Sequence, residues 1–257
     1  MKKYIPLLVL LFSISFGLRA QTLSNDNFVY SSAPKKAVQA ANFNTLTKDE
    51  MSQSVTYFDG LGRPIQTTAI NQGVNGADLV TPIVYDGFGR QVLEYLPYSI
   101  SNSTTTYPRI AMSSSTASLT GLYNTPKYEN TSNPFSEKSL EASPLNRVLK
   151  QASPGTAWAM NSGHEIKFDY QTNKDGEVRL FKVGSSGLTS TGVYDISLLD
   201  SGTYPANELY KTVTYDENTT PGNKVGTEEF KNKEGQVVLK RTYESQVEHN
   251  TYYVYDN

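Results

Sequence analysis

Residues 55–66 read VTYFDGLGRPIQ, and residues 82–93, which begin 27 positions later, read PIVYDGFGRQVL. Each copy places a run of β-branched and aromatic residues before Asp-Gly-x-Gly-Arg and a second such run after it. Runs of this composition favour strands, and Asp with Gly favours a tight turn. Because an internal repeat constrains the architecture before any residue is given a role, the repeated unit is predicted to be a β-hairpin.

The turn residues of both copies have a physical role. Each aspartate can accept a hydrogen bond from the backbone N–H two residues further on, and the glycines permit positive φ without steric cost. Each arginine opens the return strand, where its guanidinium is expected to stack on the aromatic ring that precedes the aspartate. The predicted structural motif comprises Phe58, Asp59, Gly60, Gly62 and Arg63 in the first copy, and Tyr85, Asp86, Gly87, Gly89 and Arg90 in the second.

The two motifs resemble the YD repeats of the Rhs family, which are tyrosine-aspartate hairpin units that build large secreted β-shells. The whole chain is similar to the N-terminal domain of unknown function that precedes the repeat array in Bacteroidetes Rhs-type proteins. Glu141–Leu149 and Tyr252–Asn257 carry this resemblance further along the sequence. The resemblance implies a non-catalytic module that starts or caps such a shell, with further YD repeats or the remainder of the shell as its partner. The family's known activities, a C-terminal toxin and a self-cleaving aspartyl protease core, belong to regions that these residues do not match.

The first twenty residues are typical of a secretory signal peptide. Lys2 and Lys3 precede an apolar run at Ile5–Leu18, and Ala20 offers a small residue for cleavage before Gln21. The run is shorter than the roughly 20 apolar residues that span a bilayer, and no cysteine follows it to carry a lipid anchor. The chain is therefore expected to be exported to the cell surface or beyond, and not to be membrane-embedded after the signal is removed.

The composition excludes some classes of function. The 257 residues include no cysteine, so neither disulfides nor thiol chemistry is available. Removing the first twenty residues leaves 20 of the 23 Lys and Arg residues against 25 Asp and Glu, a net charge of about −5. Nucleic acid is not expected as a partner, because phosphate binding needs clustered cations. Stability must come from burial, for which the 18 Tyr and 10 Phe are suited.

The predicted fold class is all-β, with antiparallel YD-repeat-like hairpins, long loops rich in Ser, Thr and Asn, and at most one or two short helices. The predicted segments are a signal peptide at 1–20, a strand with two hairpins at 21–98, a polar loop region at 99–139 and further hairpins at 140–257. The last of these segments ends in an incomplete repeat, so the natural polypeptide is expected to continue into more repeats.

Several local elements are expected within these segments. Asn27–Ser31 is predicted as a strand, and the Ala-rich Lys35–Asn42 is weakly helical in composition. The polar region is expected to lie as a loop over the sheet with a short helix near Ile110–Leu122, although a disordered linker between two lobes is an alternative. Phe135–Gln151 is interpreted as a degenerate repeat, and Glu165–Leu180 is predicted to form a long hairpin through Asp175-Gly176.

No motif indicates a metal or cofactor site. His164 and His249 are far apart in sequence and lack companion ligands for zinc. Asp59, Asp86 and Asp175 lie in Gly-containing turns, but these loops lack the dense oxygen ligands that Ca²⁺ requires. The paired glycines are followed by a strand and not by the helix that a dinucleotide loop needs. No cofactor is expected.

No motif indicates an enzyme either. The sequence has no GxSxG or HExxH pattern, and nothing singles out a pair of carboxylates for glycoside hydrolysis. Trp158 is expected to cover a sheet edge or to form a platform for carbohydrate. The leading hypothesis is a non-catalytic structural module, and the alternative is a module that binds glycan or protein at the cell surface through exposed tyrosines.

Overall fold

The computed structural model describes residues 26–101, 107–188, 190–219, 221–222 and 224–255. The signal peptide predicted at 1–20, with cleavage between Ala20 and Gln21, lies outside the described residues. The chain divides into two compact units. The first comprises the residues up to Val84 together with Tyr95–Leu122, and the second comprises Tyr85–Glu94 together with the chain from Tyr123 onward.

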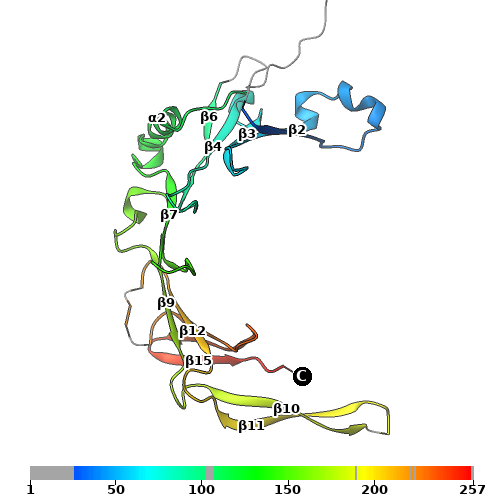
Figure 1. The fold of residues 1–257 in the computed structure, drawn as a ribbon, viewed down its shortest axis with the longest axis vertical. Coiled ribbons are helices and arrows are strands. Elements are labelled where there is room, and N and C mark those ends of the chain that lie inside the picture. Colours follow the sequence, from blue (N-terminus) through cyan, green and yellow to red (C-terminus); the bar gives the residue numbers. More distant parts are fainter. Residues whose placement is uncertain (1–25, 102–106, 189, 220, 223, 256–257) are drawn as a thin grey trace, which may run out of the picture. The chain divides into compact units, whose positions relative to one another are not determined.

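The first unit is built on a five-stranded antiparallel sheet with the strand order β1-β2-β3-β4-β6 (Figure 1). β1 overlaps the strand predicted at Asn27–Ser31. The weakly helical segment expected at Lys35–Asn42 becomes a 3-10 helix that begins only at Ala40. The strands are β1 (Phe28–Pro34), β2 (Met51–Phe58), β3 (Pro64–Ile70), β4 (Asp78–Pro82) and β6 (Tyr98–Ile100), and the 3-10 helices are η1 (Ala40–Thr45), η2 (Lys48–Glu50) and η3 (Val74–Gly76).

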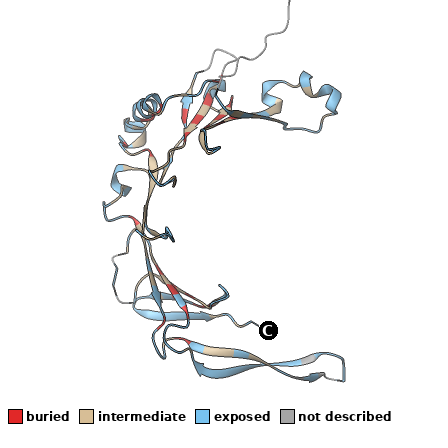
Figure 2. Cartoon of the chain, in the orientation of Figure 1, coloured by how far each residue is buried: buried red, intermediate tan, exposed pale blue. Residues whose placement is uncertain are grey.

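The core of the first unit lies on the face of β2 and β3. Val55, Tyr57 and Ile70 are almost fully buried there together with Tyr107. The alternation of buried and partly exposed residues along β2 and β3 follows the two-residue period of a strand. Figure 2 shows the buried residues as short stretches on these strands.

The segment after the first sheet lies over that sheet. The side chain of Gln66 donates to the carbonyl of Pro108 at 3.2 Å and accepts from the N–H of Ile110 at 2.7 Å. The helix α2 (Met112–Tyr123) follows, and its Ser115 hydroxyl lies 3.0 Å from that of Tyr98. The expected loop with a short helix near Ile110–Leu122 is therefore present in the described part of this region.

The second unit contains an eight-stranded sheet with the order β15-β14-β13-β12-β9-β8-β7-β5. Neighbouring strands of the sheet follow one another along the chain except at two places: β6 and α2 of the first unit lie between β5 and β7, and an insertion lies between β9 and β12. The insertion is a separate two-stranded antiparallel ribbon of β10 and β11 (Figure 1). The strands are β5 (Leu93–Tyr95), β7 (Phe135–Leu140), β8 (Val148–Ala152), β9 (Ile166–Thr172), β10 (Arg179–Leu188), β11 (Tyr194–Thr203), β12 (Tyr210–Tyr215), β13 (Thr227–Lys231), β14 (Val237–Glu244) and β15 (Val247–Tyr252), and the 3-10 helices are η4 (Pro126–Tyr128) and η5 (Thr156–Trp158).

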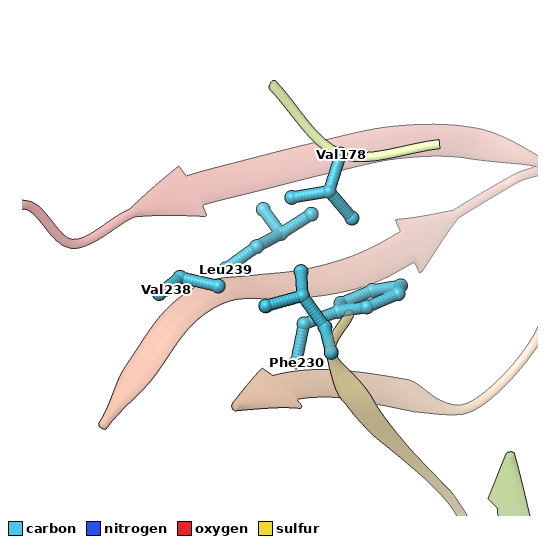
Figure 3. Packing of buried hydrophobic residues seen from close by; sticks show 5 residues of the cluster. Val178, Phe230, Val238 and Leu239 are labelled. Atoms are coloured by element: carbon cyan, nitrogen blue, oxygen red, sulfur yellow. The ribbon is translucent and has the colours of Figure 1, made fainter. Parts of the chain in front are cut away.

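The hydrophobic core of the second unit forms where the base of the ribbon meets the sheet. Val178 and Leu209 come from the two ends of the ribbon insertion and pack against Phe230, Val238 and Leu239 of β13 and β14. Figure 3 shows Val178 above the side chains of Leu239 and Phe230. Burying these apolar side chains stabilises the contact between the ribbon base and the sheet, by roughly 25 cal/mol for each Å² of apolar surface removed from water.

The predicted all-β fold class is confirmed for the described residues, which form antiparallel sheets and contain one α-helix. β2 and β3 form the first predicted hairpin, and β7 and β8 form the degenerate one. The second repeat differs from the prediction. Its turn is present, but β4 before it pairs with β3 and β6, and β5 after it joins the eight-stranded sheet. The turn is a local structure, whereas strand pairing is decided by distant segments.

The hairpin predicted at Glu165–Leu180 is wrong. β9 pairs with β8 and β12, and β10 pairs with β11 instead. The buried Asn173 joins the two ends of the inserted ribbon, because its side chain accepts from the N–H of Leu209 at 2.8 Å and donates to the carbonyl of Pro205 at 2.8 Å. β9 and β12 thereby stay neighbours although 37 residues, 173–209, separate them along the chain.

Candidate functional site

The turn at Asp59–Arg63 is closed by two backbone hydrogen bonds. The N–H of Asp59 donates to the carbonyl of Arg63 at 2.9 Å, and the N–H of Gly62 donates to the carbonyl of Asp59 at 3.0 Å. Gly62 has φ +77°. This is a three-residue hairpin loop in which a left-handed glycine forms a bulge. A separate register shift lies further into the ladder, where Tyr57 pairs with Gln66 and Phe58 with Pro64, so that Ile65 is an extra residue on β3. Gly60 has no positive φ, so only the second glycine of the motif needs its conformational freedom.

The side chains of Asp59 and Arg63 form what we call an acid–arginine clasp. Oδ1 of Asp59 accepts the N–H groups of Leu61 and Arg63, both at 2.9 Å. Oδ2 accepts Nε of Arg63 at 2.8 Å, and the terminal Nη2 lies at the same distance. The carboxylate therefore accepts four N–H donors. One of them is the donor predicted from the sequence, the backbone N–H of Leu61 two residues after Asp59.

The second motif has the same geometry. Asp86 accepts the N–H groups of Phe88 and Arg90 at 2.9 Å and Nε of Arg90 at 2.8 Å. Gly89 has φ +77°, and Gly87, like Gly60, has no positive φ. The guanidinium of Arg90 lies 5.0 Å from the ring centre of Phe88, a turn residue that the sequence did not single out. Its Nη1 also donates to the side chain of Asn146 at 2.6 Å, which links this turn to the next one.

The degenerate repeat contains a longer clasp. Glu141 replaces the aspartate, and its carboxylate accepts Nε of Arg147 at 3.0 Å and Nη2 at 2.8 Å. The N–H of Glu141 donates to the carbonyl of Arg147 at 2.9 Å, so the pair again closes the turn. The guanidinium of Arg147 lies 4.5 Å from the ring centre of Tyr170 on β9, a placement that favours cation–π attraction.

A neutral pair occupies the same positions between β13 and β14. The N–H of Asn232 donates to the carbonyl of Gln236 at 3.0 Å, and Gly235 has φ +83°. The Asn232 amide nitrogen donates to the side-chain oxygen of Gln236 at 2.8 Å. One turn geometry therefore recurs in both units, with a charged or an amide pair at its ends.

The clasps lower the pKa values of their carboxylates. The backbone N–H and then the guanidinium of Arg63 hold the pKa of Asp59 below its ordinary 3.8, and Arg90 does the same for Asp86. The Arg147 guanidinium, with help from Ser143, lowers the pKa of Glu141 from 4.5 to about 2. These acids stay ionised and saturated with donors near neutral pH, which suits a structural role and not proton transfer.

The lowered pKa of Glu141 predicts a pH dependence of stability. Because the folded value lies below the unfolded one, the stabilisation is complete above pH 4.5 and is lost as the pH falls toward 2. We expect a melting temperature that is flat from pH 7 to 5 and falls below pH 4.5. Glu141→Gln should melt lower at pH 7 and show a shallower acid slope in calorimetry. An identical slope in both proteins would exclude Glu141 as a contributor.

Removing one arginine tests the clasp directly. Arg90→Ala should lower the free energy of unfolding by about 1 kcal/mol, since it removes a two-nitrogen ion pair and a ring contact in a partly buried turn. Arg109→Ala is the matched control, because Arg109 makes a single exposed ion pair with Asp26 at 3.4 Å. That variant should stay within about 0.5 kcal/mol of the parent in urea unfolding. Equal losses in the two variants would contradict a special role for the clasp.

Sequence reasoning missed a buried cluster of four charged side chains in the second unit. We call it the ion cluster, and its members are Glu177, Lys211, Glu228 and Arg241. Lys211 Nζ lies 2.8 Å from Glu177 and 3.0 Å from Glu228. Burial lowers the pKa of Lys211, but its hydrogen bonds to both carboxylates outweigh burial and raise the pKa above its ordinary value. The cluster carries two positive and two negative charges, which indicates a neutral structural network.

The other singled-out residues lie outside these turns. His164 precedes β9 with its ring 5.3 Å from that of Trp158, and His249 lies on β15. Trp158 is 38% exposed in η5.

In the described parts of the chain, no three His, Cys, Asp or Glu residues gather closely enough to hold a metal ion. Within the same residues, no helix is both long and apolar enough to cross a membrane.

The fold and the turns define a class of protein: antiparallel hairpin sheets whose turns are closed by acid–arginine pairs. The model of the family described as "Domain of unknown function (DUF6443)" matches residues 30–172, more than half of the chain. The chain therefore belongs to this family. The match begins in β1, ends in β9 and includes all three clasps. Among curated proteins, no sequence matches the chain.

Proposed function

We propose that this chain is a non-catalytic, exported structural module that forms the N-terminal part or cap of a β-shell of the Rhs/YD-repeat type. The observation that carries the proposal is the recurrence of one hydrogen-bonded turn, twice as Asp-Gly-x-Gly-Arg and once with Glu141 and Arg147. Repetition of a closed turn is typical of a repeating architecture, in which one local unit recurs along the chain.

The chemistry of the clasps supports the absence of catalysis in this proposal. An acid that receives four donors has no free lone pair directed at a substrate, and its lowered pKa removes it from proton transfer at neutral pH. The ion cluster is likewise neutral and internally paired. These groups stabilise the fold by holding turns and strands together.

The sheet of the second unit supports growth by strand addition. β15 is the last strand in the order of the eight-stranded sheet, and its residues from Val247 to Thr251 are exposed. An edge strand offers backbone N–H and carbonyl groups to a further strand. Further YD repeats or the remainder of a shell are the partners that we propose for this edge.

The experiment compares the chain with a fusion that carries two YD hairpins after Asn257. If the hairpins continue the sheet, amide hydrogen exchange in β15 should slow by at least about tenfold, whereas exchange in β1 of the first unit should not change. A fusion of equal length with a scrambled sequence is the control. Unchanged exchange in β15 with the folded hairpins attached would contradict the shell role.

An alternative function is the binding of glycan or protein at the cell surface. The specific observation that favours it is a pair of half-exposed tyrosines after β15, Tyr253 and Tyr255, which are 43% and 42% exposed. Large aromatic surfaces left open to water are typical of contact sites.

A further inference from the structure

A small groove in the second unit combines aromatic and amide side chains in its lining. It has a volume of about 260 Å³ and lies between β10, the turn that joins β13 to β14, and the residues after β15. Aromatic rings from three separate segments border it. They are Phe181, Tyr204, Tyr253 and Tyr255.

The rings are held in place by the surrounding backbone. The N–H of Tyr253 donates to the carbonyl of Val238 at 3.0 Å, and the hydroxyl of Tyr255 donates to the carbonyl of Val237 at 3.0 Å. Phe181 meets the ring of Tyr252 edge-on with centroids 5.0 Å apart. These hydrogen bonds fix the positions of the two tyrosines and leave their rings partly exposed. The aromatic surface of the groove is therefore organised before any ligand binds.

Amide groups lie next to the rings. Asn232 and Gln236 both line the groove, and the hydrogen bond between them uses the side-chain oxygen of Gln236. The Nε2 group of Gln236 makes no hydrogen bond to another described residue, so its two N–H groups are available. Lys182 is the charged residue among the described lining residues, and it forms no ion pair within the described part of the chain.

We propose that this groove binds one sugar ring of an extracellular polysaccharide. The C–H faces of a pyranose are apolar and pack on aromatic rings, while its hydroxyl groups hydrogen-bond to planar amides; the groove supplies both. Its volume lies just below the 300–1,000 Å³ of pockets for drug-sized molecules, which suits a single ring of a longer chain. The ammonium of Lys182 would favour a carboxylated sugar over a neutral one. This proposal rests on the alternative function and on the proposed export, because it uses the same two tyrosines, and it does not rest on the shell role.

The test is saturation-transfer NMR on the purified chain with three probes: tetragalacturonate, cellotetraose and xylotetraose. We expect saturation transfer to at least one probe and the tightest binding for tetragalacturonate. Tyr253→Ala and Gln236→Ala should each weaken binding by about tenfold or more. Lys182→Gln should weaken the binding of tetragalacturonate and leave the binding of the two neutral probes unchanged.

Tyr210→Ala is the matched control, because Tyr210 is 62% exposed on β12 and does not line the groove. This variant should bind like the parent, and circular dichroism should show that all variants fold. Absence of transfer to all three probes at millimolar concentration would overturn the proposal. So would binding that survives both groove substitutions or that is lost equally in Tyr210→Ala.

Discussion

Arg241→Ala is expected to lower the free energy of unfolding of the second unit by about 3–5 kcal/mol, the typical loss when one partner of a buried ion network is removed. Arg241 is 7% exposed, and each of its three guanidinium nitrogens contacts a different partner. Nη1 lies 3.1 Å from Glu228, Nη2 donates to the backbone carbonyl of Glu177 at 3.1 Å, and Nε donates to Asn250 on β15 at 2.8 Å.

The size of the effect follows from what the substitution leaves behind. Two carboxylates would then share one remaining cation, Lys211, in a buried site. The site would carry one uncompensated negative charge, which costs several kcal/mol, more than the original pair contributes. Arg241 also lies 5.4 Å from the ring centre of Phe230, so its removal weakens the contact between the ion cluster and the hydrophobic core.

Urea unfolding followed by tryptophan fluorescence measures this effect, since the single tryptophan, Trp158, belongs to the second unit. Lys233→Ala is the control, because Lys233 pairs with Glu208 on the surface with 61% of its side chain exposed, and it should cost less than about 1 kcal/mol. Arg241→Lys should fall between the two, as an ammonium cannot reach three partners in fixed directions. A loss below 1 kcal/mol for Arg241→Ala would contradict a stabilising ion cluster.

Local signals in the sequence predicted local structure well. The hairpin of β2 and β3 follows from strand composition and from the turn at Asp59–Arg63, where every hydrogen bond joins residues within four positions. The same turn recurs at Asp86–Arg90, yet its flanking strands join different sheets. A turn motif fixes the direction of the chain over five residues and carries no information on which distant strand supplies the next ladder.

The sequence also lacked a signal for the turn between β14 and β15. β14 and β15 are joined at Ser245 and Gln246, which both have positive φ at 50° and 69°. Glycine or asparagine normally marks such a two-residue turn, so this hairpin was not predicted. Conversely, the sequence analysis gave a conformational role to all four glycines of the two motifs. Only Gly62 and Gly89 adopt positive φ.

The ion cluster was missed because charged residues in a strand are usually interpreted as its solvent face. Glu228 and Arg241 are direct cross-strand neighbours, and each lies two positions from a buried apolar residue of its own strand, Phe230 and Leu239. The two-residue period therefore placed both charges on the core face. Opposite charges at matching positions of adjacent strands were the signal that could have revealed the pair.

Tyr57→Ala should lower the free energy of unfolding of the first unit by about 3–5 kcal/mol, as expected when a fully buried aromatic side chain is truncated. Tyr57 is 0% exposed and packs with Val55, Ile70 and Tyr107, and its hydroxyl donates to the carbonyl of Tyr107. Alanine would leave a cavity between the sheet and the segment that covers it, together with a carbonyl deprived of its donor.

Two further variants separate these contributions. Tyr57→Phe keeps the ring and removes only the hydroxyl, so it should cost about 1–3 kcal/mol through the loss of the buried hydrogen bond to Tyr107. Leu61→Ala removes a side chain of the first unit that is 79% exposed, and it should cost less than about 1 kcal/mol. Hydrogen exchange in β2 and β3 reports the first unit without interference from the second. If Tyr57→Ala and Leu61→Ala had similar effects, the core of the first unit could not be centred on Tyr57, and the hydrophobic face of its repeat hairpin would have to be stabilised elsewhere.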